Sequence, residues 1–527
     1  FSFLGMASIE FVAVPRKDVD TTQFGSNNAI IICGESSLLE AKTVSILQHF
    51  LPDDQIPKYL GGLLSKSCNS HSGATATTIL PGNEEGSYTR LSFVRIPSDC
   101  TRHNCPTRPD VVYEKLPSLL SSENKGSATF IRVVFALPNN SPFTEKESAV
   151  SFAGALGRSS RLYSRKKSSS EISVEAAFWS TSDDRFCWED DSLFLKQLGF
   201  ATESVRQAAY LVDQPCNECN TTYMTNRAKQ LVDDLSSNEN VKGTVSLFKC
   251  CIGDDLDAEG FGGIFGVGKA AAHPPALVVL KYEPPSSKET VAWVGKGIVY
   301  DTGGLSMKTK TTMPGMKRDM GGSAAILEAF RATCLIGCDK TVYAVLCLAE
   351  NAVGRLATRP DDIHTLYSGV TVEINNTDAE GRLVVGDGVA FVSKHLGVDV
   401  LLDMCTLTGA QGIATGQRHS SIICNSESIE QKAVVAGRKT GDMCHPLPYC
   451  PELFTVEFKS QVADMKNSVK NRNNAQPSCA AQFIASHLVN YENEWIHVDM
   501  ASPSHKGEIA TGYGALLLLQ MFVLNTE

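Results

Sequence analysis

Long hydrophobic runs are missing from this sequence of 527 residues. Its most apolar stretch, Ala515 to Leu524, is far shorter than the ~20 residues that a transmembrane helix needs. It predicts a buried terminal helix instead. The first residues lack the basic region and cleavage pattern of a signal peptide, and Met6 is a candidate initiator with residues 1–5 added ahead of it. We therefore expect no membrane association.

An excess of positive charge is also absent. The chain has 48 Lys and Arg against 58 Asp and Glu, a formal net charge of −10. This balance argues against a general binder of nucleic acids or anionic membranes. One basic stretch, Gly157 to Ser170, is interpreted as a solvated loop, so no nucleic-acid partner is expected.

The 17 cysteines follow no regular spacing, which disfavours a disulfide framework. Cys33, Cys347 and Cys405 stand in apolar runs and are interpreted as small buried hydrophobic residues. A reducing, cytoplasmic compartment follows more easily than a secreted one. Cys216 and Cys219 have CxxC spacing, but no second pair lies nearby to complete a zinc site.

Several common catalytic motifs are missing as well. The sequence contains neither a GxSxG nucleophile elbow nor an HExxH zinc helix. Gly263 to Ala270 nearly fits a phosphate-binding loop, but Ala270 replaces the hydroxyl residue that would hold magnesium. An acidic loop, Asp254 to Glu259, is expected before it, where a strand should be. These flanks disfavour nucleotide binding.

The length exceeds what one hydrophobic core normally organises, so two domains are expected. We predict an N-terminal α/β accessory domain over 1–204 and a second domain over 205–527, with the boundary near an amphipathic helix at Thr202 to Val212. The second domain alternates strand-like and helix-like segments, which predicts a mixed, largely parallel sheet covered by helices on both faces. Its expected elements are strands at 276–281, 290–294, 341–348 and 398–403 and helices at 321–334 and 383–395.

Charged residues concentrate between a strand at 370–374 and the helix at 383–395. The segment Asn375 to Arg382 contains Asp378, Glu380 and Arg382. Loops at such strand ends are where α/β folds build their sites. The alternative is an Asx-type turn, in which Asn376 and Asp378 bend the chain and cap the helix.

Two earlier stretches of the sequence favour a functional site over a capping turn. Val294 to Gly304 contains Lys296 and Asp301, and Lys308 and Asp319 follow. The alternative here is a set of glycine-rich turns with surface lysines and a capping Asp319. Yet Asp301, Asp319, Asp378 and Glu380 at one sheet edge would repel one another unless cations neutralise them. Two divalent metals are the economical solution, and mostly oxygen ligands point to zinc, manganese, magnesium or cobalt.

These motifs are similar to those of the leucyl aminopeptidase family of dimetal exopeptidases, and closest to its animal aminopeptidase-like branch. The matching stretches are 294–304, Lys308, 319–322, the family signature 376–382, the substrate-cleft strand end 406–410, the run 463–468 and the late core motif 495–501. The resemblance extends over roughly 205–523. The N-terminal half shows little recognisable similarity.

The resemblance implies a set of metal ligands, which are Lys296, Asp301, Asp319, Asp378 and Glu380. Asp301 and Glu380 would bridge the ions, Asp378 would complete one site with its carboxylate and backbone carbonyl, and Lys296 and Asp319 would complete the other. A lysine ligand is a neutral amine, so a lowered pKa is expected for Lys296.

The resemblance also implies the catalytic groups. The nucleophile would be a water activated by both metals. Lys308 would polarise the scissile carbonyl, and Arg382 would hold a bicarbonate that acts as general base. Met316, Thr406, Leu407 and Gly409 would bind the substrate. Because Ser502 replaces a glycine that is usual in the family, we expect an apolar-accepting pocket rather than a strict leucine preference.

The resulting expectation is a cytoplasmic, metal-dependent aminopeptidase that releases N-terminal, apolar, leucine-like residues from peptides. Family analogy implies a homohexamer of two stacked trimers. One alternative is a binding or scaffold protein that retains the metal site. Another is a different dimetal hydrolase such as a phosphoesterase, which the small number of histidines disfavours.

Overall fold

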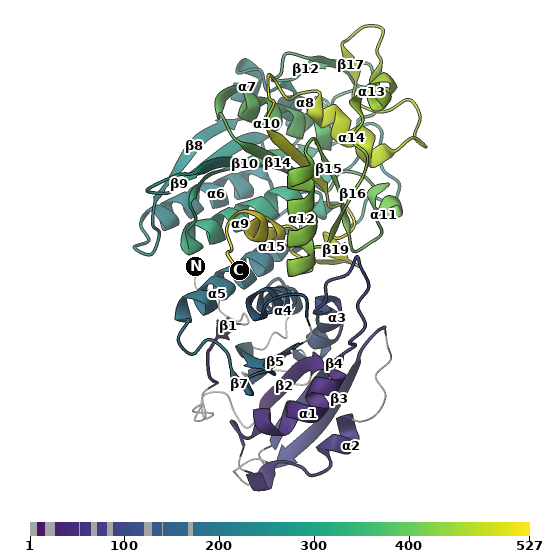
Figure 1. Cartoon of the computed structure of the whole chain (residues 1–527). Coiled ribbons are helices and arrows are strands. Elements are labelled where there is room, and N and C mark those ends of the chain that lie inside the picture. The colour runs from purple at the N-terminus through teal and green to yellow at the C-terminus, as the bar shows by residue number, and fades with distance from the viewer. Residues whose placement is uncertain are drawn as a thin grey trace. The chain divides into compact units, whose positions relative to one another are not determined.

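The computed structural model describes residues 8–15, 27–51, 53–64, 71–81, 88–120, 129–139, 141–166 and 172–526. Met6 and residues 167–170 of the basic stretch lie outside this range. The chain forms two compact units (Figure 1). The first runs to Arg206 and includes Arg438–Gly441 and the C-terminal residues from Asn525. The second comprises Gln207–Gly437 and Asp442–Leu524.

The first unit is built on a sheet with the strand order β1-β6-β5-β2-β4-β3, and β7 pairs with β6. Its strands are β1 (Ser8–Phe11), β2 (Asn27–Glu35), β3 (Ala74–Pro81), β4 (Tyr88–Ile96), β5 (Thr129–Leu137), β6 (Ile172–Ser180) and β7 (Arg185–Phe186). All neighbours are parallel except β3 with β4 and β6 with β7. The helical elements are α1 (Ser36–Leu47), η2 (Asp53–Gln55), α2 (Leu60–Leu64), α3 (Pro109–Leu120), α4 (Glu145–Ser159) and α5 (Ser192–Asp213). Helix α5 continues into the second unit.

The second unit is built on a larger sheet with the order β16-β15-β18-β14-β10-β11-β9-β8. Its strands are β8 (Thr244–Ile252), β9 (Ala276–Glu283), β10 (Glu289–Asp301), β11 (Lys340–Asn351), β14 (Val400–Cys405), β15 (Ser420–Cys424), β16 (Cys444–Pro446) and β18 (Glu494–Asp499). The central strands β11, β10, β14 and β18 are parallel, whereas β8, β9 and β15 pair in antiparallel fashion with their neighbours, β15 with β18. The prediction of a mixed, largely parallel sheet is confirmed.

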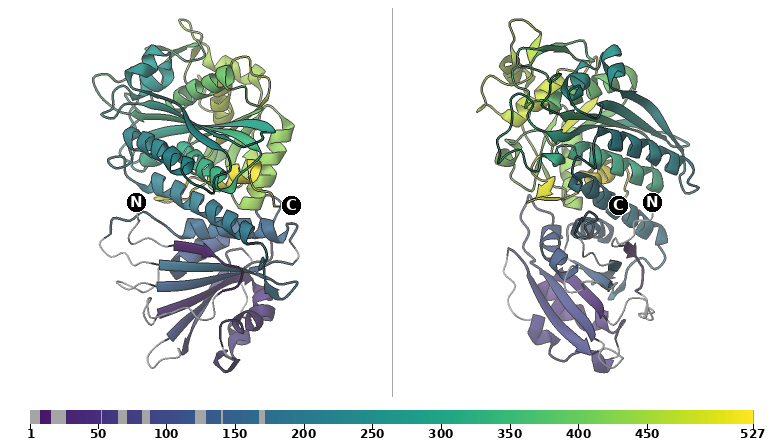
Figure 2. Two further views of the ribbon diagram at one scale, coloured as in Figure 1. Left: turned by 90° about the vertical axis from the view of Figure 1, so that its left-hand side faces the viewer. Right: turned by 180° about the vertical axis from the view of Figure 1, so that it is seen from behind.

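Helices cover both faces of this sheet (Figure 2). They are α6 (Thr221–Ser236), α7 (Asp254–Ala258), α8 (Gly262–Gly268), η3 (Met316–Arg318), α9 (Gly321–Ile336), α10 (Gly381–His395), α11 (Gln411–Ala414), α12 (Glu427–Thr440), α13 (Pro451–Phe454), η4 (Thr455–Phe458), α14 (Gln476–Ala485) and α15 (Ala515–Phe522). Two small sheets complete the unit, one of β12 (Ile363–Thr365), β13 (Thr371–Glu373) and β17 (Met465–Lys466), the other of β19 (His505–Lys506) and β20 (Ile509–Ala510).

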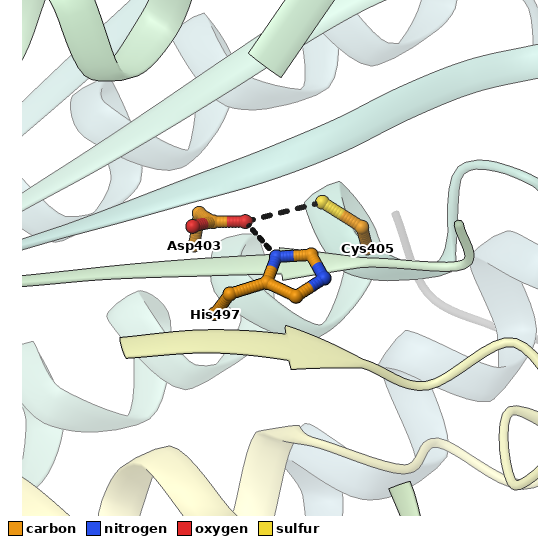
Figure 3. A group of neighbouring side chains, drawn as sticks. All are labelled: Asp403, Cys405 and His497. Carbon is orange, nitrogen blue, oxygen red and sulfur yellow. Dashed lines mark hydrogen bonds and ion pairs between the residues drawn. The ribbon is translucent and has the colours of Figure 1, made fainter. Parts of the chain in front are cut away.

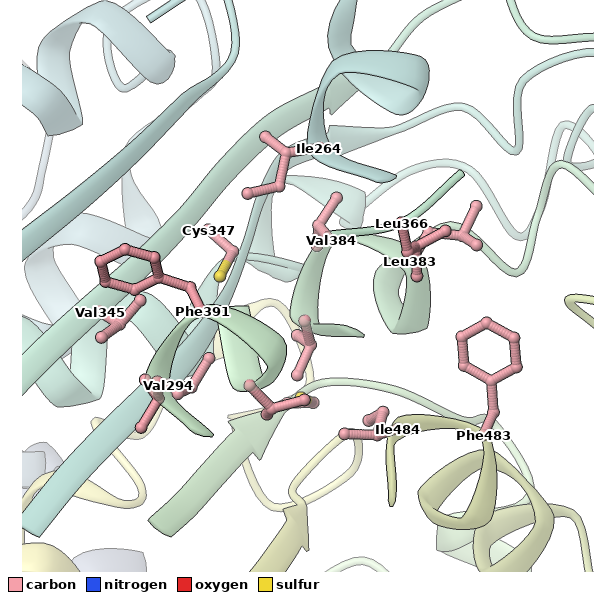
Figure 4. Packing of buried hydrophobic residues seen from close by; sticks show 14 of the residues in the cluster. Ile264, Val294, Val345, Cys347, Leu366, Leu383, Val384, Phe391, Phe483 and Ile484 are labelled. Carbon is pink, nitrogen blue, oxygen red and sulfur yellow. The ribbon is translucent and has the colours of Figure 1, made fainter. Parts of the chain in front are cut away.

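Alternate residues of β10 face the two helical layers. Trp293 points to α15, where its ring lies 5.9 Å from that of Phe522. Val294 faces the other way, into a buried apolar cluster with Cys347 of β11, Val384 of α10 and Ile484 of α14 (Figure 4). The sheet is therefore buried on both faces, as its nearly continuous apolar strands predict.

The central parallel strands all end at the same edge of the sheet. Strand β10 ends at Asp301, which pairs with Asn351 at the end of β11. Strand β14 ends just before Thr406, and β18 ends at Asp499. Helix α9 begins very close to these strands, since a Cβ at Gly322 would lie 2.0 Å from the carbonyl oxygen of Met404. This edge is where an α/β sheet builds a site.

One local expectation, an acidic loop, is wrong, and two capping alternatives are not realised. The acidic segment before the glycine-rich loop is helix α7 rather than a loop, because its backbone closes helical turns ahead of α8. The capping role of Asp378 is not realised: the residue before α10 is Glu380, and no side chain caps that helix. The Asx turn itself is present, since Asn376 Oδ1 accepts a hydrogen bond from the Asp378 N–H at 3.0 Å. Asp319 likewise does not cap α9.

In the described part of the chain, no helix combines the length and the apolar character needed to cross a membrane.

Candidate metal centre

A cavity of about 470 Å³ opens at the carboxyl edge of the larger sheet. All eleven residues that the sequence singles out line this cavity. They are Lys296, Asp301, Lys308, Met316, Asp319, Asp378, Glu380, Arg382, Thr406, Leu407 and Gly409. They come from strand β10 and the loop after it, from η3 and the residue that follows it, from the loop before α10 and the first turn of that helix, and from the segment after β14. The fold thus brings together groups that lie more than 100 residues apart in the chain.

Three carboxylates form the centre of the cavity wall. Asp301, Asp378 and Glu380 each offer an oxygen atom, and these oxygens lie within 4.8 Å of one another. Burial raises the pKa of Asp301, and the charge of Glu380 raises it further. Burial also raises the pKa of Asp319. The Oε2 atom of Glu380 is buried and has no hydrogen-bond partner among the described residues. This crowded, oxygen-rich donor set fits divalent cations.

Two lysines neutralise these carboxylates. The Nζ of Lys308 lies 2.7 Å from Asp301 Oδ2 and 2.5 Å from Asp378 Oδ1. The Nζ of Lys296 lies 2.7 Å from Asp319 Oδ2 and 3.1 Å from Glu380 Oε1. Its side chain runs along the start of α10, where a Cβ at Gly381 would lie 2.4 Å from Lys296 Cε. Each ammonium therefore connects two carboxylates that come from different loops.

The protonation of Lys296 differs from the expectation for a lysine ligand. Burial lowers its pKa, but the charges of Asp319, Glu380 and Asp301 outweigh burial and raise the pKa above the ordinary value. The protein's own groups thus favour the ammonium. Only a cation of higher charge among the same carboxylates would make the neutral amine favourable.

Asn351 and Asn467 form hydrogen bonds that hold the loops carrying the carboxylates. The sequence did not predict either role. The Nδ2 of Asn351 donates to Asp301 Oδ1 at 2.8 Å and to the carbonyl oxygen of Thr377 at 3.0 Å. The Nδ2 of Asn467 donates to the carbonyl oxygen of Asn376 at 2.7 Å. Asn467 lies in the conspicuous run 463–468, but nothing in the local pattern indicates Asn351.

Asp499 positions the loop after β14. Its Oδ1 accepts from the Leu407 N–H at 3.0 Å, and its Oδ2 accepts from the Thr408 N–H at 3.1 Å and the Thr408 hydroxyl at 2.7 Å. In the loop so held, the Thr406 hydroxyl donates to Asp319 Oδ1 at 2.8 Å, and the Thr406 carbonyl accepts from Lys296 at 3.0 Å. Asp499, the last residue of β18, therefore positions Thr406 against Asp319 and Lys296.

Arg382 presents a buried guanidinium beside the cluster. Its Nε and Nη1 atoms have no hydrogen-bond partner among the described residues. Its Cζ lies 5.9 Å from the ring centre of Phe483. Burial lowers the pKa of Arg382 to about 10, although the charge of Glu380 raises it, so the group stays cationic at neutral pH. Unpaired donors in a buried guanidinium indicate a place for an anion.

A second group of potential ligands, Asp403, Cys405 and His497, lies within the larger sheet, on β14 and β18 (Figure 3). His497 Nδ1 lies 2.5 Å from Asp403 Oδ1, which Cys405 also approaches at 3.5 Å. Trp495 Nε1 donates to Asp403 Oδ2 at 3.0 Å. Burial lowers the pKa of His497, but Asp403 raises it more. These contacts make a buried ion pair, and none of the three residues lines the cavity.

Comparison with known proteins identifies relatives along most of the chain. Residues 206–519 match the family described as the cytosol aminopeptidase family, catalytic domain. Residues 28–169 match the M17 aminopeptidase N-terminal domain 2, so the N-terminal half has a recognisable relationship that its motifs do not reveal.

Three relatives illustrate the extent of the similarity. The Mus musculus protein named "Probable aminopeptidase NPEPL1" is 48% identical over 433 residues, which cover 81% of this chain and 78% of that protein. Leucine aminopeptidase 1 of Caenorhabditis elegans is 37% identical and covers 93% of each chain. The solved apo structure of leucyl aminopeptidase from Trypanosoma cruzi is 37% identical, with a TM-score of 0.85 over 98% of this chain and 97% of that one.

The role of Asp499 gives a first prediction. Asp499→Asn should lower the free energy of unfolding by about 1–3 kcal/mol, because an amide group would face N–H donors that now meet a buried acceptor. Urea unfolding followed by tryptophan fluorescence measures this. The matched control is Asp464→Asn, since exposed Asp464 accepts from the Thr371 N–H at 2.8 Å and its hydroxyl at 2.7 Å. Equal effects of both substitutions would contradict the role of Asp499.

Proposed function

Since this chain belongs to the cytosol aminopeptidase family and is an exopeptidase of the hydrolase class, we propose that it releases apolar, leucine-like residues from the free N-termini of peptides with the help of two divalent cations per subunit. The observation that supports this most is the cluster of four carboxylates and two lysines in one cavity. A binding protein would have no need to keep so costly an arrangement complete.

Each proposed ligand belongs to one or both of the two ion sites. Asp301 and Glu380 would hold both ions, Asp378 would hold one with its carboxylate and backbone carbonyl, and Lys296 and Asp319 would hold the other. Zinc or manganese suits these ligands, and magnesium or cobalt is compatible with them. When bound, the cations activate a water molecule, bind the free amine of the substrate and make the scissile carbonyl more electrophilic.

Lys308 is the proposed electrophilic group of the protein itself. Burial lowers its pKa, but the charges of Asp301 and Glu380 raise it more, so its side chain is an ammonium at neutral pH. It is still partly open to the cavity. From this position its N–H bonds would stabilise the negative charge that develops on the carbonyl oxygen.

Arg382 is the proposed holder of a bicarbonate ion. Its unpaired Nε and Nη1 donors can bond to an oxyanion, and the start of α10 adds a favourable dipole. Bicarbonate held there would accept a proton during the attack of water. The buried position of Arg382 means that a bound anion would remove an unfavourable isolated charge.

Met316, Thr406, Leu407 and Gly409 are the proposed contacts of the first side chain of the substrate. They line the same cavity as Ala501 and Ser502. We further propose that the enzyme works in the cytoplasm as a homohexamer of two trimers. The family relationship supports both statements.

Metal dependence is the first test of this function. Chelation should abolish hydrolysis of leucyl coumarin amide, and zinc, manganese or cobalt should restore it. Added ion should also raise the midpoint of thermal unfolding, because only the folded chain assembles the site. The double substitution Asp378→Asn and Glu380→Gln should remove this rise, whereas Glu373→Gln, outside the cavity, should leave it unchanged. If the metal-stripped wild-type protein does not hydrolyse the amide after these ions are added back, the scaffold alternative is favoured.

Replacement of Lys308 tests the proposed electrophile. Lys308→Met should lower kcat by about 100- to 1,000-fold, the usual effect of losing one donor to a developing oxyanion. Steady-state kinetics with leucyl coumarin amide measures it, and circular dichroism checks the fold. Lys310→Met, an exposed neighbour in the same loop, is the matched control and should keep full activity. Retained activity in Lys308→Met would exclude this role.

Replacement of Arg382 tests the anion site. Removal of bicarbonate from the buffer should slow the wild-type enzyme about tenfold or more, as expected for the loss of a general base. Arg382→Ala should be slow from the outset and insensitive to bicarbonate. Exposed Arg355→Ala should respond like the wild type. An Arg382→Ala variant that still responds to bicarbonate would place the anion elsewhere.

A further inference from the structure

The cavity wall also contains Arg318, an arginine that has no role in the function proposed above. It is the last residue of η3 and directly precedes Asp319. Met316, Ala501, Ser502 and His505 line the same cavity. Arg318 therefore lines the same cavity as the residues that the proposed function assigns to the first side chain of the substrate.

The charge of Arg318 is not neutralised by the protein. Its Nη1 lies 3.5 Å from the carbonyl oxygen of Gly507, at the limit of a hydrogen bond. No described carboxylate forms an ion pair with it. The neighbouring carboxylate, Asp319, already lies 2.7 Å from Lys296 Nζ and accepts from the Thr406 hydroxyl. By contrast, each cavity lysine contacts two carboxylates.

His505 beside Arg318 adds hydrogen-bonding capacity but no charge. Burial and the positive charge of Arg318 lower the pKa of His505 to about 4, so the ring is neutral at pH 7. Its Nδ1 lies 3.4 Å from the hydroxyl of Ser504. One further arginine of the wall, Arg472, is exposed. The acidic residues that line the cavity all belong to the metal cluster. Outside the metal cluster, no acidic residue of the cavity lining is therefore available to neutralise Arg318.

We infer that Arg318 is a specificity-determining residue that pairs with a carboxylate on the first side chain of the substrate and repels basic first residues. The enzyme would then accept glutamyl peptides in addition to leucyl peptides and discriminate against lysyl peptides. This inference rests on the proposed function. The carboxylate could also be the C-terminus of a dipeptide, and the position of Arg318 between Met316 and Asp319 favours the side chain.

The expected size of the effect follows from the partial exposure of the guanidinium. An ion pair at such a site is weakened by water and salt, so discrimination on the order of tenfold is expected rather than thousands. Added salt should reduce it, because screening acts on the charge and not on shape.

The test compares coumarin amides of Glu, Gln, Lys and Leu with the metal-loaded wild-type enzyme. Glu and Gln have nearly the same shape, so their ratio of kcat/KM isolates charge. The wild type should prefer Glu to Gln and disfavour Lys, each by roughly tenfold, and 0.5 M NaCl should bring the ratios toward one. Arg318→Met should remove both preferences, whereas Arg318→Lys should keep them.

The matched control is Arg359→Met, which removes an exposed guanidinium paired with Asp362 at 2.9 Å and outside the cavity. It should retain the wild-type ratios. A second pair of substrates, Leu-Gly and Leu-Gly amide, differs only in the C-terminal carboxylate. The ratio of their kcat/KM values therefore detects recognition of that group. A charge preference that appears only in this pair would overturn the assignment to the first side chain.

The outcomes separate the inference from the function on which it rests. Hydrolysis of the Leu amide without a Glu preference over Gln in the wild type would overturn the inference alone. If no aminoacyl amide is hydrolysed, both fail. The wild-type ratios and the Arg318→Lys variant decide the question even if Arg318→Met does not fold.

Discussion

Mutual repulsion among buried carboxylates is the constraint on which the rest of this structure depends. Asp301, Asp319, Asp378 and Glu380 surround one cavity at the end of a sheet, where burial alone makes ionisation costly. Loss of one partner of a buried ion pair commonly costs about 4 kcal/mol, because the other charge remains unpaired. Lys296 and Lys308 reduce this cost by lying between pairs of carboxylates. The same repulsion makes the cavity attractive to divalent cations.

The scaffold keeps these charges in place with hydrogen bonds from groups that do not face the cavity directly. Asn351 holds Asp301, and Asp499 holds the loop that carries Thr406. These supports lie at the ends of strands whose neighbours are in fixed register, so the backbone leaves them little freedom. A site built in this way is rigid because its supporting residues belong to the sheet and not to long loops.

The two arginines of the cavity differ in their surroundings and hence in what they can do. Arg382 is buried, with unpaired donors close to Glu380, and suits a small planar anion. Arg318 is more open and lies among residues that would contact the substrate. The buried pair of Asp403 and His497 is a third arrangement, in which opposite charges satisfy each other within the sheet. Burial and local partners, more than residue type, decide between these functions.

The sequence by itself determined the chemistry of this protein. Closely spaced charged residues in 294–304 and 376–382 follow strand-like segments, and such local patterns are visible without a structure. They indicated the carboxylates, the lysines and Arg382, and alternation of apolar segments indicated the sheet. The tertiary structure alone decided what surrounds these groups. Asn351 and Arg318 carry no local signal, and the motif 495–501 does not show which loop Asp499 holds, because these roles arise from contacts with segments distant in the chain. The protonation of Lys296 was equally hidden, since it depends on three carboxylates that only folding brings within reach.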